Sequence, residues 1–223
     1  MKRENMSVLA PGLALIGCVI GWTALLVEVG LIIYGRMLEG AGFAAAAVFV
    51  FSFFSIPANI LVALCHTATL SGGRRLAFFR LPTVRAAALL YMVVVGLVYA
   101  TVLAGVWKLP GIVAIANDAL HYVAPPLYAL WWLVGAPKGR LGYAELPRWM
   151  LPPTIYLAYV VLRGAATGEY PYPFFDIAAI GTEPFLGNVA ALGATFLAVG
   201  LAIVALDGRL ARVRARRGIR CAG

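Results

Sequence analysis

Long apolar runs without charge constrain this chain more than any other feature of its sequence. Residues 41–70, 86–107 and 184–206 contain no Asp, Glu, Lys or Arg. A run of about 18 such residues gives an α-helix the length needed to cross the ~30 Å hydrocarbon layer of a membrane. Only 12% of the 223 residues are charged, against roughly 25% in a soluble domain. The sequence predicts an all-α, polytopic membrane protein.

Hydropathy and helix breakers together predict six transmembrane helices in one domain covering residues 1–223. They are expected near residues 8–33, 42–70, 86–107, 112–135, 148–166 and 185–206. The first run starts after Lys2 and Arg3 like a signal sequence, but it lacks a clear small-residue cleavage site and is expected to remain as a helix. Residues 207–223 are expected to form a basic tail.

The distribution of the 18 Lys and Arg residues predicts the orientation of the bundle. Fifteen of them fall on one side of the predicted helices, and only Arg36, Lys108 and Arg163 fall on the other. By the positive-inside rule, both termini face the cytoplasm and the chain lies in the cell (inner) membrane. The Arg-rich tail is expected to bind anionic lipid headgroups, at about 1 kcal/mol per cation. Because the charge lies in loops and in the tail, nucleic acid is not expected as a partner.

Few polar side chains fall inside the predicted helices, and each is a candidate for function because such groups are costly in hydrocarbon. Helix 112–135 carries Asn117, Asp118 and His121 at spacings that place them on one sector. We interpret Asp118 as the carboxylate that orients His121. On helix 42–70, Ser55 and Asn59 are four residues apart and share a face.

Ser55 and His121 are predicted to lie at similar depths, ~20 Å and ~15 Å below the outer ends of their helices at the helical rise. A hydroxyl and an imidazole at matching depth, with a carboxylate near the histidine, form the minimum set for acyl transfer. The amides of Asn59 or Asn117 would donate hydrogen bonds to a developing oxyanion. The structural alternative is that Ser55 bonds back to its own helix and His121 bonds across the bundle.

No metal or other cofactor is predicted. His66 lies near the opposite end of its helix, so its depth differs from that of His121 by roughly 20 Å and one iron cannot join the two. Neither HExxH nor clustered Cys and His residues point to zinc. Glu28 and Arg163 are expected at a comparable outer level, where they would form an ion pair or Glu28 would snorkel toward the interface.

Several segments, in order along the chain, resemble the androgen-induced-gene and androgen-dependent-regulator family, and more narrowly its bacterial six-helix branch. The segments are FSIPAN at 54–59, NDALHYVAP at 117–125, PKGRL at 137–141, RGA at 163–165 and YPYPFFD at 170–176. The resemblance implies a six-helix fold. In the animal members it implies an intramembrane hydrolase that cleaves fatty acid esters of hydroxy fatty acids with a threonine and a histidine.

Carried over by the resemblance, these two roles fall on Ser55 and His121. His121 lies in an Asn-x-x-x-His pattern that is similar to the family motif. Ser55 stands where the enzymes have threonine; it keeps the hydroxyl but lacks the methyl that restricts the rotamer. Asp118 stands where animal members tend to have a second histidine. The function expected from the resemblance is hydrolysis of a lipid ester, with membrane lipids as partners.

Three other functions compete with this expectation. An intramembrane peptidase would also use serine and histidine, but Phe53 and Phe54 precede Ser55 in place of a Gly-x-Ser-x-Gly setting. A small transporter would show broken helices or inverted repeats, of which only Pro57 and the Pro125-Pro126 pair give a hint. The third is a non-catalytic lipid-binding or scaffold protein. The aromatic loop at 170–174 is expected to be a rigid interfacial loop or to cap the outward mouth of a site.

Overall fold

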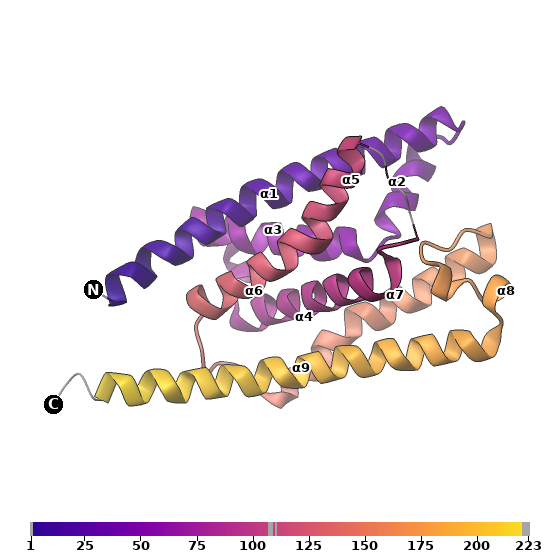
Figure 1. Cartoon of the computed structure of the whole chain (residues 1–223). Helices are drawn as coiled ribbons and strands as arrows, with labels where there is room; N and C mark the ends of the chain where they lie inside the picture. The colour runs from indigo at the N-terminus through magenta and orange to yellow at the C-terminus, as the bar shows by residue number, and fades with distance from the viewer. Residues whose placement is uncertain (1, 107–108, 110, 220–223) are drawn as a thin grey trace.

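The structure of the protein, a computed structural model, describes residues 2–106, 109 and 111–219, with side chains from Leu9 to Arg216. Every regular element within these residues is a helix (Figure 1), which confirms the prediction of an all-α chain. The α-helices are α1 (Lys2–Leu38), α2 (Phe43–Phe51), α3 (Ser55–Ser71), α4 (Pro82–Val98), α5 (Gly111–Asp118), α6 (Ala124–Gly135), α7 (Leu146–Thr167), α8 (Ile177–Ile180) and α9 (Thr182–Ile219). Short 3-10 turns are η1 (Arg74–Arg80), η4 (Tyr143–Glu145) and η5 (Pro173–Phe175), and π-helical turns are η2 (Tyr99–Leu103) and η3 (Ala119–Val123).

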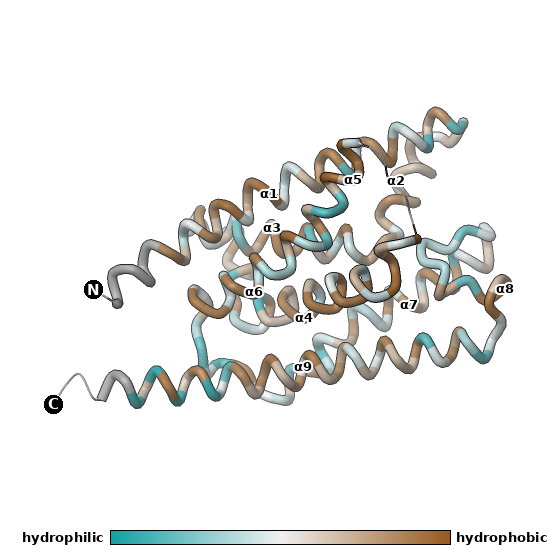
Figure 2. Tube along the Cα trace, in the orientation of Figure 1, coloured by the Kyte–Doolittle hydropathy of each residue, from teal (hydrophilic) through white to brown (hydrophobic). Residues whose placement is uncertain are grey.

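Three helical stretches of the described chain are long and apolar enough to cross a membrane: Leu9–Leu38, Pro82–Leu103 and Thr182–Arg216. The pair α2 and α3 gives a fourth candidate if the two helices count as one span, although they are bent by 77° at the break between them. Figure 2 shows apolar residues along the middle of α9 and hydrophilic residues toward its ends. Length and hydropathy therefore suit these parts of the chain to a bilayer.

The long helices lie alongside one another, with α1 and α9 on opposite sides of the bundle (Figure 1). Helix α3 contacts both α1 and α4, α6 contacts α1 and α4, and α9 contacts α4 and α7. The first described residues of α1 and the last of α9 lie at the same end of the bundle (Figure 1). The core between the helices is filled by large side chains, among them Leu90, Met92, Tyr128, Trp131 and Trp132.

The predicted helix 42–70 is not continuous, because it breaks between α2 and α3. Pro57 lacks a backbone N–H and is therefore tolerated in the first turn of α3 but not in the interior of a longer helix. At the break, Tyr156 donates a hydrogen bond to the Ser52 carbonyl (2.8 Å), and the Ser52 hydroxyl lies 2.7 Å from the Tyr159 hydroxyl. Helix α7 thus satisfies polar groups that the break leaves free.

The last predicted helix is also longer than expected, because α9 runs from Thr182 to Ile219 and takes in most of the predicted tail 207–223. Asp207, at the start of this continuation, is fully buried. Its Oδ2 accepts hydrogen bonds from the backbone amides of Gly139 (2.8 Å), Arg140 (3.0 Å) and Leu141 (3.2 Å). The carboxylate ties α9 to the loop that follows α6.

At the other end of the bundle, Glu169 joins two helices. Its carboxylate accepts hydrogen bonds from Arg36 of α1 (2.6 Å) and from Arg163 of α7 (2.8 Å). The hydrogen bond from Arg36, and after it the one from Arg163, holds the pKa of Glu169 below its usual range. Both guanidinium groups also lie over the ring of Phe49, at 4.5 and 5.8 Å. The expected pair between Glu28 and Arg163 is therefore wrong: Arg163 takes a nearer carboxylate from its own connecting loop.

Candidate functional site

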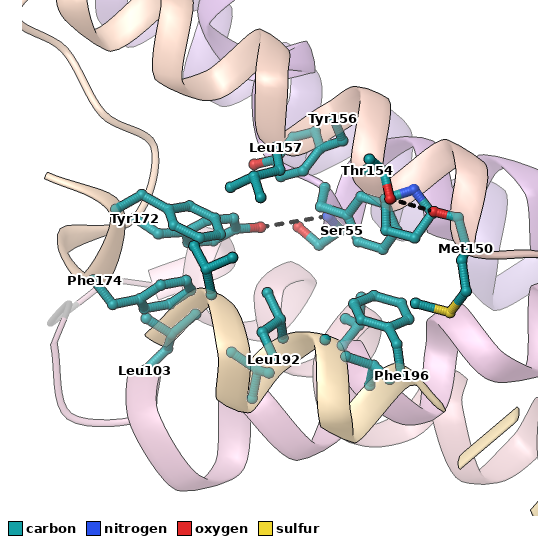
Figure 3. A pocket seen from close by; sticks show the side chains of 18 of the residues that line it. Ser55, Leu103, Met150, Thr154, Tyr156, Leu157, Tyr172, Phe174, Leu192 and Phe196 are labelled. Atoms are coloured by element: carbon teal, nitrogen blue, oxygen red, sulfur yellow. Dashed lines mark hydrogen bonds between the residues drawn. The ribbon is translucent and has the colours of Figure 1, made fainter. Parts of the chain in front are cut away.

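A pocket of about 340 Å³ lies among α3, α4, α7, α9 and the loop that follows α7 (Figure 3). This volume falls within the roughly 300–1,000 Å³ of small-molecule sites. Most of the wall is aliphatic or aromatic, and no charged side chain of the described residues lines it. The polar side chains in the wall are those of Ser55, His121, Thr154, Tyr156 and Tyr172. Such a wall suits an apolar ligand that carries one small polar group.

Ser55 is the first residue of α3 and is 5% exposed. Because the helix begins there, its backbone N–H has no carbonyl partner within α3. The N–H instead donates to the Tyr172 hydroxyl at 3.5 Å, and that hydroxyl also lies beside the Ser55 side chain (Figure 3). The 77° break therefore presents the hydroxyl of Ser55, and a backbone amide with no partner in its own helix, at the positive end of α3.

His121 lies in the π-helical turn η3 and is 7% exposed. Its Nδ1 lies 2.8 Å from the backbone carbonyl oxygen of Asn117. A carbonyl can only accept, so Nδ1 carries the hydrogen and Nε2 keeps its lone pair in the neutral ring. The ring stacks on Tyr99 at 4.2 Å between centroids. Within the described residues Nε2 has no hydrogen-bond partner, which leaves it as a proton acceptor beside the pocket.

Asp118 does not orient His121, contrary to the expectation from spacing. Its side chain is exposed, and the Asn117 carbonyl takes the place that was assigned to the carboxylate. The physical reason is the π-helical turn that begins at Ala119, which changes the rotation per residue between the two side chains. Residues three apart share a face in a regular α-helix, and that rule does not carry through this turn.

The two predicted amides also lie elsewhere, because neither Asn59 nor Asn117 lines the pocket. The Asn59 amide donates to the carbonyls of Ser55 (2.9 Å) and Leu120 (3.4 Å), so it joins the start of α3 to η3. The Asn117 amide donates to the Tyr99 hydroxyl. These amides hold the segments that carry Ser55 and His121, and neither reaches the space in which an oxyanion would form.

Glu28 is 6% exposed, and its Oε2 has no hydrogen-bond partner among the described residues. It lies inside the bundle on α1, so the expectation that it snorkels to the interface also fails. His66 packs with its ring against Tyr128 and Trp131, at 5.2 and 5.0 Å between centroids. The described residues contain no group of three or more His, Cys, Asp and Glu side chains that would hold a metal ion.

Tyr99 and Tyr172 are site residues that sequence reasoning did not assign. Tyr172 is 8% exposed, and its ring stacks on Phe174 at 5.2 Å between centroids. In the 170–174 loop, Tyr172 and Phe174 both line the pocket. Burial raises the pKa of Tyr172 to about 12, so its phenol stays protonated and able to donate. The sequence does not mark Tyr99 as a site residue, because a tyrosine near a helix end is also typical of a membrane interface.

Ser55 and His121 thus share one pocket, but no hydrogen bond joins them in the part of the chain that the structure describes. A comparison of the chain with protein-family models, with curated proteins and with solved structures gives no match.

Proposed function

We propose that this chain is an intramembrane hydrolase of lipid esters, with Ser55 as nucleophile and His121 as general base. The observation that carries the proposal is the pocket itself, in which a serine hydroxyl and an imidazole are set in an otherwise apolar, uncharged wall. An ester with long hydrocarbon chains is neutral and apolar except at its carbonyl group. The resemblance to the androgen-induced-gene family, on the segments around Ser55 and His121, is part of the same proposal.

The proposed reaction begins when Nε2 of His121 takes the hydroxyl proton of Ser55. The Ser55 oxygen attacks the ester carbonyl carbon, and the carbonyl electrons move onto oxygen. Collapse of this intermediate breaks the ester C–O bond, and the departing alkoxide receives the proton from His121. A water molecule then gives a proton to His121 and attacks the acyl group on Ser55. The free fatty acid leaves as Ser55 regains its proton.

Two donors in the wall are suited to the oxyanion of this reaction. They are the Ser55 backbone N–H and the Tyr172 hydroxyl, which now bond to each other at 3.5 Å. A long, weak bond of this kind is exchanged at little cost for two bonds to a charged oxygen, which are about twice as strong as neutral ones. The N-terminus of α3 adds a positive dipole end at the same point. Loss of one such donor costs roughly 10²–10³ in turnover.

The proposal includes six membrane passes, with both termini in the cytoplasm. It is supported by the bias of Lys and Arg toward one side of the predicted helices. The first described residues of α1 and the last of α9 lie at the same end of the bundle in Figure 1, which agrees with an even number of passes. Membrane lipids are the proposed partners, with anionic headgroups along the basic end of α9.

A non-catalytic lipid-binding protein is the second candidate, favoured by one observation. The Ser55 amide is engaged by Tyr172, and His121 by Asn117 and Tyr99, so each group already has a structural role. A transporter is supported less well. The break between α2 and α3 resembles the discontinuous helices of transporters, but the pocket wall of the described residues has no charged group to bind an ion.

Covalent labelling separates these candidates. The purified protein in detergent is treated with a long-chain fluorophosphonate, and the hydrolysis of a long-chain alkyl ester is measured in parallel. We expect labelling that Ser55→Ala abolishes and that His121→Ala reduces by roughly 10²–10⁴. Tyr172→Phe, which keeps the ring and removes only the donor, should lower turnover by roughly 10²–10³. Ser52→Ala is a matched control, because Ser52 lies at the same break but does not line the pocket. Equal turnover in wild type, Ser55→Ala and His121→Ala refutes the hydrolase.

A further inference from the structure

Among the described residues that line the pocket, only Thr154 on α7 and Gly193 on α9 are exposed; the others are buried or half-buried. Figure 3 shows residues of α7 along one side of the pocket and Leu192 and Phe196 of α9 along the other. The pocket therefore opens on the outer surface of the bundle between these two helices. We call the gap beside Thr154 and Gly193 the α7–α9 opening.

The surface around this opening is apolar. Leu151 and Ile155 on α7 are 57% and 60% exposed, and Leu186 and Leu197 on α9 are 58% and 45% exposed. Large exposed aliphatic side chains at this density face lipid in a membrane-type bundle and would be costly in water. The opening therefore faces hydrocarbon chains.

Charged residues on the same two helices lie far from the opening. On α7, Thr154 is six residues from Arg148 and nine from Arg163, or ~9 and ~14 Å at the helical rise. On α9, Gly193 is ten residues from Glu183 and fourteen from Asp207, or ~15 and ~21 Å. The opening therefore lies within the uncharged stretches of both helices, residues 149–162 on α7 and 184–206 on α9.

Gly193 keeps the opening free of side chains. A Cβ added there meets no heavy atom within 4 Å, so space remains beside the helix at this point. Its neighbours Leu192 and Phe196 line the same wall. Gly193 thus lines the pocket at a position where a larger side chain has room.

We propose that the pocket fills sideways from the bilayer core through the α7–α9 opening, and that its ligand is a neutral lipid ester. The identity of the ligand as an ester rests on the proposed function. The entry route rests only on the α7–α9 opening. The acyl esters of a phospholipid lie near the headgroups, and to reach Ser55 at this depth the phosphate would be drawn into hydrocarbon without a counter-charge. An ester with no charged group nearby dissolves in the core and arrives at the correct level.

Photolabelling tests the route separately from catalysis. The protein with Ser55→Ala, which keeps the ligand intact, is placed in phosphatidylcholine vesicles that contain a long-chain alkyl ester bearing a diazirine. Gly193→Trp is compared with Gly187→Trp. Gly187 is exposed, an added Cβ there also meets nothing within 4 Å, and it does not line the pocket. Both substitutions remove a glycine from the same helix, so their effects on helix stability match.

We expect Gly193→Trp to lower labelling of pocket peptides by roughly tenfold or more, which corresponds to about 1.4 kcal/mol, and Gly187→Trp to leave it unchanged. Equal labelling in the two variants would overturn the route. If Gly193→Trp does not fold, Gly193→Leu repeats the comparison with a smaller side chain. A phosphatidylcholine with the same diazirine chain should label the pocket several-fold less than the alkyl ester; equal labelling would overturn the neutral class. If the wild-type protein does not hydrolyse the ester but the labelling pattern is as expected, the proposed enzyme activity is refuted and the proposed route is not.

Discussion

Replacement of Asp207 by alanine is expected to destabilise the fold more than any other single change at the basic end of the bundle. The carboxylate is fully buried and accepts three backbone amides, from Gly139 at 2.8 Å, Arg140 at 3.0 Å and Leu141 at 3.2 Å. Hydrogen bonds to a charged group contribute about 1.5–3 kcal/mol each. They are not additive, and breaking a buried charged arrangement typically costs about 3–5 kcal/mol.

At about 2–4 °C per kcal/mol for a chain of this size, Asp207→Ala should lower the apparent Tm by roughly 6–20 °C. Asp207→Asn keeps one acceptor oxygen and should lose about half as much. Thermal melting in detergent, followed by intrinsic tryptophan fluorescence, measures both. The control is Asp176→Ala, where one half-buried carboxylate caps α8 by accepting the Ala179 amide at 3.1 Å; this loss should cost only about 1 kcal/mol. If Asp207→Ala melts no lower than Asp176→Ala, the carboxylate does not hold the loop and the argument fails.

Two further predictions concern packing and charge. Burial lowers the pKa of Lys138 from 10.5 to about 7, and the nearby positive charge of Arg214 is the second cause. Between these two pH values the unfolded chain holds a proton that the folded chain has released. The free energy of unfolding should therefore rise with pH across that window. Lys138→Met should flatten this rise, measured as apparent Tm at pH 7 and pH 9.5, and the same slope in both proteins would contradict the assignment. A Cβ at Gly17 would lie 2.4 Å from His66 Nε2, whereas one at Gly21 would lie 3.6 Å from the Ala63 Cβ. Gly17→Ala should therefore cost about 1–3 kcal/mol from overpacking, while Gly21→Ala should be neutral or stabilising by up to about 1 kcal/mol; similar melting of the two variants would show that His66 can move away freely.

Helix content was predictable from the sequence, because long uncharged runs have few alternatives to helices in a bilayer. The breaks and π-helical turns within these helices were harder to predict from the sequence. The break before Ser55 had a signal in Pro57, which prefers the first turn of a helix, but Phe53 and Phe54 continue the apolar run and hide it. The π-helical turn around His121 had a signal only in Pro125 and Pro126, which follow it after Ala124 and lack a backbone N–H.

The sequence indicated which polar side chains would be buried in the bundle, but it did not predict correctly which of them contact one another. Ser55 and His121 line one pocket, in line with the matching depth expected from their positions along the predicted helices. Arg163 was matched with Glu28 by depth alone, whereas the loop brings Glu169 within 2.8 Å. Depth counts residues along a helix axis and contains no information about which way a side chain points around it.

The orientation of His121 by a peptide carbonyl has a consequence for mutagenesis. The Asn117 oxygen that holds Nδ1 belongs to the backbone, so it is present whatever side chain stands at position 117. An alanine scan in search of a third member of a catalytic triad would therefore find none, even though His121 is held in one tautomer. The tolerance has a limit: deletion of Ala119 would remove the extra residue of the π-helical turn and rotate the His121 ring away from the pocket, although Asn117 and His121 both remain in the chain.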